Sequence, residues 1–362
     1  MSNEQAANVV STFEMILHAL EGPNARIASI DVLSERSIQH LSAFNLAPRG
    51  QPDGYLHALV EEQARTNGDR VAVDAWDGVL TYRELDQYAT ALRAQLLAMN
   101  LNLSGRVVPL CAEKGSWAVV GMLAILKAGA ACSPLDPSQP RDRLEGMVRA
   151  CSAKAAVATQ LHASLLRMET VAVVAASSDG VETEAASPIP TAPSPLSAAF
   201  LMWTSGSTGQ PKGVLLGHAS LCLSITTYAT ASQFTGETRT FEFTSFTFTV
   251  SLCDMFGTFS QGGCVCLPSD SQRLNDLAGA LRHFRAAFCW LISTSLAGLH
   301  PGNVPDLRSV TVGGESLAPD LVARWALHSR LTVSYGTTET CGWCLLNPGL
   351  TPGSDSRVLG KP

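Results

Sequence analysis

Leu201-Met202-Trp203-Thr204-Ser205-Gly206-Ser207-Thr208-Gly209-Gln210-Pro211-Lys212-Gly213 is the stretch around which this chain is organised. The apolar run at residues 198–203 predicts a buried strand, and a loop of hydroxyl side chains and glycines follows it. Glycines let a backbone approach an anion and turn its N–H groups inward, and a lysine adds positive charge. The loop therefore suits a polyphosphate. It departs from the Walker A pattern, because Lys212 is followed by Gly213 rather than by a hydroxyl residue.

A flexible Ser/Gly linker is the alternative interpretation of such a loop. The full string, however, closely resembles the phosphate-loop signature of the adenylate-forming (AMP-binding) superfamily, which includes acyl-CoA synthetases, luciferases and the adenylation domains of nonribosomal peptide synthetases. The resemblance implies ATP and Mg²⁺ as cofactors. It also implies that the hydroxyls, glycines and lysine of the loop contact ATP, namely Thr204, Ser205, Gly206, Ser207, Thr208, Gly209 and Lys212.

The composition fits a globular protein with more than one core. The chain has 362 residues, of which 46% are hydrophobic and 15% are charged. The net charge of −6 and the lack of a basic cluster argue against nucleic-acid binding, and no apolar run approaches the ~20 residues of a membrane span. The ten cysteines lie in apolar segments without zinc-ligand spacing, so we expect reduced core thiols in a cytoplasmic protein.

Strand-like and helix-like segments alternate along the chain, which predicts an α/β fold with mostly parallel sheets. Thr81 and Glu84 have the spacing of a helix capping box, and Gly129 has the position of a helix C-terminal cap. Expected helices are at 10–20, 55–65, 82–97, 117–127, 161–168, 219–230 and 320–328. Expected strands are at 71–73, 107–111, 130–135, 155–158, 171–175, 198–203, 264–266, 307–312 and 332–335.

The domain organisation follows from the resemblance. The strings at residues 80–85 and 126–137 resemble the first two core motifs of adenylation domains, and residues 1–45 resemble the linker between a condensation and an adenylation domain in fungal peptide synthetases. Residues 46–362 then correspond to the large N-terminal subdomain, with two βα halves separated by an exposed Ser/Pro-rich loop at 177–197. The small C-terminal domain and its catalytic lysine have no counterpart, so we assign no catalytic residue and expect a truncated fragment that adenylates slowly.

The segment at residues 246–256 resembles the fourth core motif, Phe-Asp-x-Ser, in which the aspartate pairs with the α-ammonium group of the substrate. Thr249 stands at the aspartate position and follows Phe248. A threonine cannot supply the charge, and a charge-assisted bond in a closed pocket is worth about 1.5–3 kcal/mol. We therefore expect an acid without a conventional α-ammonium group: an aryl, keto, hydroxy or fatty acid, or a β-amino or aromatic amino acid. Alternatively another acid replaces the aspartate, or the domain is degenerate. Asp254 is expected to have a structural part in the helix that follows.

Two later segments resemble the nucleotide-binding turns of the family. In the first, at residues 307–317, a strand runs into Gly313, Gly314 and Glu315, which by resemblance border the adenine; simple turn glycines are the alternative. In the second, at residues 332–340, Tyr-Gly-Thr-Thr-Glu stands where the family has Tyr-Gly-Pro-Thr-Glu. The resemblance implies ATP contacts by Ser334, Tyr335, Gly336 and Thr338 and a metal contact by Glu339. A tyrosine ring can stack on adenine, and a carboxylate suits Mg²⁺.

The resemblance also implies a set of positions that line the acyl pocket. These are Phe248, Thr249, Val250, Cys253, Leu291, Thr311, Gly313, Ser334, Gly342 and Trp343. The set is uncharged, and Trp343 would occupy much of the space, which favours a small or flat acid. For Val250 and Leu291 a plain core position is the alternative, and the alignment around Leu291 can shift by a residue or two.

The predicted function is ATP-dependent activation of a carboxylic acid as an acyl-adenylate. In the peptide-synthetase branch, a carrier-protein phosphopantetheine thiol then captures the acyl group, and neighbouring synthetase modules are the partners. An acyl- or aryl-CoA synthetase and a catalytically inactive nucleotide-binding module are the alternatives. All of this requires that residues 204–213 meet Tyr335 and Glu339 in space.

Overall fold

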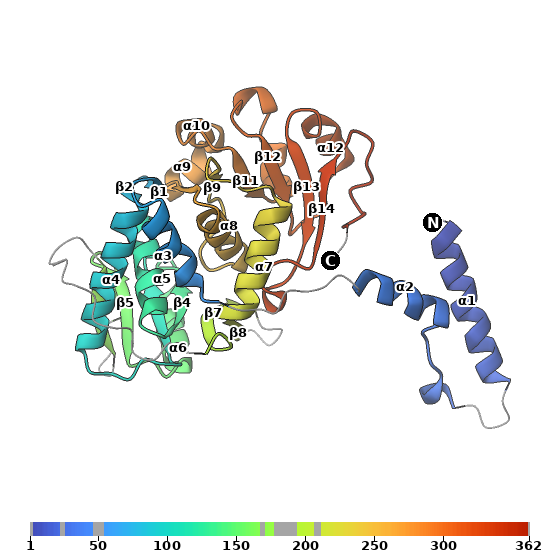
Figure 1. The fold of residues 1–362 in the computed structure, drawn as a ribbon, viewed down its shortest axis with the longest axis horizontal. Helices are drawn as coiled ribbons and strands as arrows, with labels where there is room; N and C mark the ends of the chain where they lie inside the picture. Colours follow the sequence, from blue (N-terminus) through green and yellow to red (C-terminus); the bar gives the residue numbers. More distant parts are fainter. Residues whose placement is uncertain are drawn as a thin grey trace. The chain divides into compact units, whose positions relative to one another are not determined.

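The structure is a computed structural model that describes residues 3–21, 26–45, 54–166, 171–176, 194–205 and 211–360. It divides into two units, residues 1–51 with 361–362, and residues 52–360 (Figure 1). In the first unit, α1 (Asn3–Leu20) and α2 (Glu35–Asn45) are joined through η1 (Ile27–Ser29). The Arg36 guanidinium donates to the Asn8 side-chain oxygen at 2.8 Å. The predicted helix at 10–20 lies within α1, whereas α2 was not predicted.

The second unit contains an eight-stranded sheet and a six-stranded sheet. Their strand orders are β14-β13-β12-β11-β9-β10-β1-β2 and β6-β5-β3-β4-β7-β8. Only the edge pairs β1–β2, β13–β14 and β7–β8 are antiparallel among the described strands. The predicted α/β fold with mostly parallel sheets is confirmed. The strands are β1 (Val71–Ala75), β2 (Gly78–Thr81), β3 (Val107–Cys111), β4 (Ala131–Leu135), β5 (Ala155–Thr159), β6 (Ala172–Ala176), β7 (Ala198–Thr204), β8 (Lys212–Gly217), β9 (Arg239–Phe241), β10 (Cys264–Leu267), β11 (Phe288–Leu291), β12 (Ser309–Val312), β13 (Arg330–Tyr335) and β14 (Leu345–Leu350).

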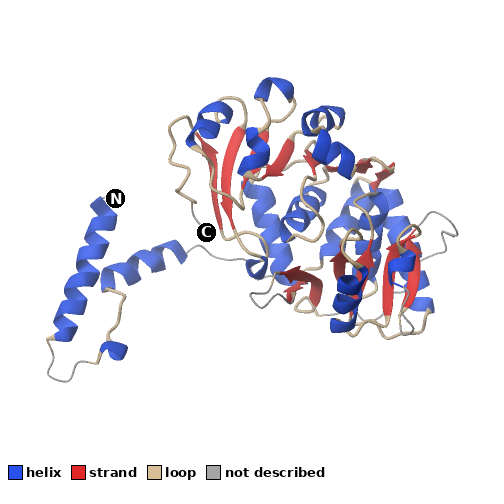
Figure 2. Ribbon diagram, turned by 180° about the vertical axis from the view of Figure 1, so that it is seen from behind, coloured by secondary structure: helices blue, strands red, loops and turns tan. Residues whose placement is uncertain are grey.

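A layer of helices lies between the two sheets. Figure 2 shows the strands in separate groups with helices between them. The hydrophobic cluster of this layer joins residues of both sheets, such as Val265 and Val157, to the helices α3 (Leu56–Thr66), α4 (Tyr82–Ala98), α5 (Ser116–Lys127), α7 (His218–Ala231) and α8 (Thr249–Ser260). The sequence of α5 is apolar on every face, and the helix is accordingly buried on nearly all sides. The outer faces of the sheets are covered by α6 (Arg141–Ala150) with η2 (Ala163–Leu166), and by α10 (Leu277–His283), α11 (Ser293–Ala297) and α12 (Pro319–Trp325), whereas α9 (Asp270–Asn275) has no buried residue.

Several local predictions can be compared directly with the structure. The capping box of Thr81 and Glu84 is present, and Gly129 adopts a φ of 77° after α5. The predicted helix at 161–168 is wrong, because the described part forms only the short 3₁₀ helix η2; residues 167 and 168 lie outside the described residues. The predicted helix at 320–328 ends earlier, as α12. Of the expected exposed loop, residues 177–193 also lie outside the described residues.

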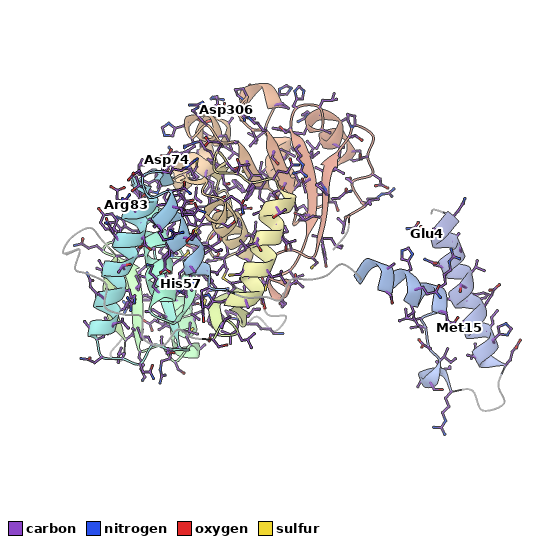
Figure 3. All side chains as sticks on the ribbon, viewed as in Figure 1. Glu4, Met15, His57, Asp74, Arg83 and Asp306 are labelled. Carbon is purple, nitrogen blue, oxygen red and sulfur yellow. The ribbon has the colours of Figure 1, made fainter. Side chains whose placement is uncertain are left out.

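Two buried histidines connect the helices of the central layer. The ring of His57 on α3, labelled in Figure 3, lies 5.7 Å from the ring of His218 on α7. The Leu56 amide donates to His218 Nδ1 at 3.3 Å. Burial lowers the pKa of each histidine to about 4, since desolvation disfavours the charged ring. Both side chains are therefore neutral at pH 7. None of the helices that the structure describes is long and apolar enough to cross a membrane.

Candidate functional site

The predicted phosphate loop begins and ends on an antiparallel hairpin. Thr204 at the end of β7 pairs with Lys212 at the start of β8, and the Thr204 hydroxyl donates to the Lys212 carbonyl at 3.4 Å. Ser205 and Lys212 are exposed. Gly206, Ser207, Thr208 and Gly209 lie outside the described residues, so their contacts with ATP stay predictions.

The carboxyl ends of the neighbouring parallel strands β12 and β13 bring Gly313 beside Ser334. A Cβ atom on Gly313 would lie 2.5 Å from Ser334 Oγ and 3.1 Å from Trp290 Cζ2, so only glycine fits there. The Ser334 hydroxyl donates to the Val312 carbonyl at 3.1 Å and accepts from Trp290 Nε1 at 3.3 Å. The crevice outside the carboxyl ends of parallel strands is where α/β folds bind ligands.

Glu315 follows the glycine turn and has partners within the protein. Its carboxylate accepts hydrogen bonds from the Thr294 amide at 2.9 Å and the Thr294 hydroxyl at 3.2 Å. These bonds hold the turn that contains Gly314, which has a φ of 77°, against α11. Glu315 therefore positions the glycine turn, and a contact between Glu315 and a nucleotide stays a prediction.

The second nucleotide segment lies next to the hairpin. Tyr335 ends β13 with half of its surface exposed, and η4 (Thr338–Thr340) follows and contacts β8. The expected approach of the Glu339 segment to the Lys212 strand is therefore found. The Glu339 carboxylate is exposed and has no hydrogen-bond or ion-pair partner among the described residues.

A single free carboxylate fits Mg²⁺, which usually keeps several waters and is bound by one or two carboxylates together with substrate phosphates. The described residues contain no cluster of three or more His, Cys, Asp or Glu side chains that could hold a metal ion by themselves. A magnesium ion at Glu339 would thus take its remaining ligands from phosphate oxygens and water.

The predicted acyl-pocket residues of α8 meet the segment that follows η4. A Cβ atom on Gly342 would lie 2.7 Å from Cys253 Sγ and 3.6 Å from Thr249 Cγ2. The Cys341 carbonyl accepts from Cys253 Sγ at 3.4 Å and from the Ser224 hydroxyl of α7 at 3.0 Å. These contacts bring residues 341–343 against α7 and α8.

Aromatic rings complete this part of the site. The Trp343 indole stacks on the Tyr228 ring with centroids 5.0 Å apart and lies 6.2 Å from the Trp290 indole. Phe248 is 62% exposed at the start of α8, whereas Val250 is partly buried and packs against the core. Aromatic rings of this kind can pack against a flat apolar group.

One predicted pocket residue belongs elsewhere. Leu291 is fully buried in the hydrophobic cluster on the other side of the eight-stranded sheet, together with residues such as Val312. Its neighbour Trp290 reaches the glycine turn instead, because successive side chains of a strand face opposite sides of the sheet. Leu291 therefore has the plain core position that was the alternative, and Trp290 is the residue of β11 (Phe288–Leu291) that lies next to the glycine turn.

Sequence reasoning also missed Tyr228 and the position of Asp254. Both are completely buried, and the Tyr228 hydroxyl donates to Asp254 Oδ1 at 2.9 Å. Tyr228 lies within the predicted helix at 219–230. No local sequence pattern distinguishes a tyrosine that packs in the core from one that lines a binding site. For Asp254 in α8, the sequence predicts only a structural part.

None of the ten cysteines forms a disulfide, and seven of them are buried. Burial raises the pKa of most of these thiols, among them Cys253 and Cys289. Such neutral thiols behave as small apolar groups in the core.

Comparison with known proteins identifies the class to which this fold and site belong. The AMP-binding enzyme family matches residues 60–362, and the chain belongs to this family of adenylate-forming enzymes. Its relatives include the nonribosomal peptide synthetase otaB of Aspergillus carbonarius, 66% identical over the whole chain, and otaB of Aspergillus niger, 60% identical over the whole chain. The chain spans 19% of the length of each of these two proteins.

Solved structures agree on the fold. The nonribosomal peptide synthetase FmoA3 in its AMPPNP-bound form has a TM-score of 0.85 at 24% identity, with 100% of this chain and 40% of that chain covered. The Klebsiella oxytoca NpsA N-terminal subdomain in complex with 3-hydroxybenzoyl-AMSN has a TM-score of 0.73 at 20% identity, with 83% of this chain and 76% of that chain covered. The predicted resemblance to peptide-synthetase adenylation domains, in the fold of their large subdomain, is confirmed.

Proposed function

We propose that this chain uses ATP to activate a carboxylic acid as an acyl-adenylate, which a carrier-protein phosphopantetheine then captures in nonribosomal peptide synthesis. The observation that carries the proposal is the contact of η4, which contains Glu339, with β8, which begins at Lys212. Two similar structures support it: FmoA3 holds AMPPNP, and NpsA-ThdA is an artificially fused adenylation–PCP di-domain.

In the proposed reaction the substrate carboxylate attacks the α-phosphorus of ATP and pyrophosphate leaves. Because the protein forms no covalent bond, its work is to position both reactants and to offset negative charge. The Tyr335 ring would stack on adenine, and the exposed Lys212 ammonium would face the phosphates together with the hydroxyl of Thr204. Glu339 would hold Mg²⁺, which neutralises phosphate charge when it is bound.

The substrate is proposed to be an acid without a conventional α-ammonium group. Thr249 is 4% exposed and supplies no charge at the position where the family motif has aspartate. The rings of Tyr228 and Trp343 beside it favour a flat acyl group over a large branched one.

ATP–pyrophosphate exchange across a panel of aryl, keto, hydroxy, fatty and amino acids tests this function. Exchange with aryl or hydroxy acids, and its loss in Lys212→Ala, is the expected result. A strong preference for ordinary L-α-amino acids would contradict the proposed substrate class. Nucleotide binding without exchange for any acid would instead indicate an inactive module. Offering coenzyme A and a carrier protein in parallel separates a CoA synthetase from a peptide-synthetase domain.

A further inference from the structure

A fully buried carboxylate lies beside the predicted acyl pocket. Asp254 follows Cys253 on α8, and its Oδ1 accepts a hydrogen bond from the Tyr228 hydroxyl at 2.9 Å. The Tyr228 ring in turn stacks on Trp343. The other carboxylate oxygen, Oδ2, is buried and has no hydrogen-bond partner among the described residues. Tyr228 therefore joins an incompletely paired acid to the wall of the pocket.

A second polar atom in the same region, Thr249 Oγ1, is also buried without a hydrogen-bond partner within the described part of the chain. Thr311 and Trp343 have polar neighbours inside the protein, the Tyr228 phenol and the Cys253 thiol. Buried polar groups in native proteins nearly always have partners, because an unpaired one keeps its desolvation cost. Two such atoms, Asp254 Oδ2 and Thr249 Oγ1, can therefore be paired by a polar group of a ligand.

The local charges show which kind of polar group is missing. Behind Asp254 lies the fully buried Glu242, whose two carboxylate oxygens also lack hydrogen-bond partners among the described residues. Lys114 is the cation that acts on both carboxylates; its Nζ is 3.9 Å from Glu242 Oε1 and donates to the carbonyls of Glu242 and Thr244. Burial raises the pKa of Asp254 to about 7 and the pKa of Glu242 well above its usual range. Glu242 is therefore protonated at pH 7 and carries an O–H donor of its own, whereas Asp254 ionises near pH 7, and its Oδ2 is then an acceptor without a donor among the described residues.

We propose that Asp254, oriented by Tyr228, is a specificity-determining residue of the acyl pocket, and that the acid this site selects carries an amino or hydroxyl donor on its acyl part that bonds Asp254 Oδ2. The inference rests on the proposed function and deepens it by naming the substrate class. The carboxylate that Thr249 cannot supply is in this site provided by Asp254, on the same helix, for a donor remote from the usual α-ammonium position.

Calorimetric binding to the 362-residue chain tests the inference without requiring turnover. The probes are non-hydrolysable acyl-sulfamoyl-adenosine analogues of benzoic acid and of its ring-hydroxyl and ring-amino derivatives, with butanoic acid and its terminal hydroxyl and amino derivatives as a second scaffold. At least one donor-bearing analogue is expected to bind about tenfold or more tightly than its parent, as a hydrogen bond to a buried charged group implies. The hydroxyl and amino arms show which donor the site takes.

Asp254→Asn is expected to abolish that preference, so that the donor-bearing analogue and its parent bind with equal affinity, and AMP-PNP, which carries no acyl group, reports whether the nucleotide site is intact. Glu242→Gln is the matched control, since it removes the neighbouring buried carboxylate but not the proposed acceptor, and it is expected to keep the preference. Thermal melting of both variants checks their folding, and Tyr228→Phe, which keeps the stacked ring, provides a second test if Asp254→Asn does not fold. Tyr228→Phe is expected to weaken the preference by releasing the Asp254 side chain.

The outcomes separate this inference from the proposed function. If wild-type protein binds AMP-PNP but binds the donor-bearing analogues of both scaffolds no more tightly than their parents, or if Asp254→Asn keeps the donor preference, the role of Asp254 is refuted and adenylation stands. If neither AMP-PNP nor any analogue binds, the proposed function fails and this inference fails with it.

Discussion

Replacing Gly336 with alanine is expected to separate the two segments that form the proposed nucleotide site. A Cβ atom at this position would lie 1.7 Å from the Gly342 carbonyl oxygen and 2.9 Å from Trp343 Cα. Real Cβ contacts are essentially never shorter than 3.0 Å, so the two segments must separate by about 1.3 Å. Both neighbouring atoms belong to the backbone, and no side-chain rotation can relieve the contact.

The separation would shift η4, and with it Glu339, relative to β8. Displacing a positioning group by about 1 Å can reduce a rate on the order of 100-fold. We therefore expect Gly336→Ala to slow ATP–pyrophosphate exchange about 100-fold and to weaken AMP-PNP binding in parallel. Because the same contact joins residues 341–343 to the pocket, the affinity for acyl-adenylate analogues should fall as well.

Gly146→Ala in α6 is the matched control, since its Cβ would meet nothing within 4 Å. Alanine is the better helix former by about 1 kcal/mol, so this control should melt at the same or a higher temperature with unchanged exchange. The reasoning would be refuted if Gly336→Ala exchanged pyrophosphate at the wild-type rate, because the close approach of Gly336 to Gly342 could then not be what holds the site together.

Three further predictions concern titration and metal binding. Burial depresses the pKa of His57 and His218 from 6.5 to about 4, so the unfolded chain binds more protons than the folded chain between these pH values. The stability present above pH 6.5 is therefore lost as the pH falls toward 4, by up to about 3 kcal/mol per histidine. Urea titrations of wild type and His57→Gln over that range measure the loss, and an equal dependence of the unfolding free energy on pH in both proteins would contradict it. Asp254 has a folded pKa raised to about 7, so its contribution to stability is lost as the pH rises through 7; the melting temperature of Asp254→Asn should change less from about pH 6 to about pH 9 than that of wild type. Glu339→Gln should melt at the wild-type temperature, because the Glu339 side chain is exposed and unpartnered among the described residues. Its AMP-PNP affinity should no longer depend on Mg²⁺. An unchanged Mg²⁺ dependence would exclude Glu339 as the metal ligand.

Local features of the fold were predictable because each depends on residues close together in the chain. The capping box of Thr81 and Glu84 needs only a spacing of three, and the cap at Gly129 needs only a residue that tolerates positive φ. The alternation of strands and helices likewise predicted an α/β fold with mostly parallel strands, whereas the division into two βα halves came from the resemblance to adenylation domains. At η2 the segment is short, and its tertiary environment decides its conformation. The sequence pattern predicted an α-helix there, and the structure has a 3₁₀ helix.

Taken alone, then, the sequence determined the α/β class, the family and the positions of the motifs, since these are written in local spacing and in contiguous strings. The tertiary structure decided which of those residues meet: that Trp290 rather than Leu291 reaches the glycine turn, and that Tyr228 places a buried acid beside Trp343. A shift of one residue along a strand exchanges core for pocket, because side chains alternate between the two faces. A contact between α7, α8 and the segment after η4 joins residues far apart in the chain, and no periodicity along the sequence records it.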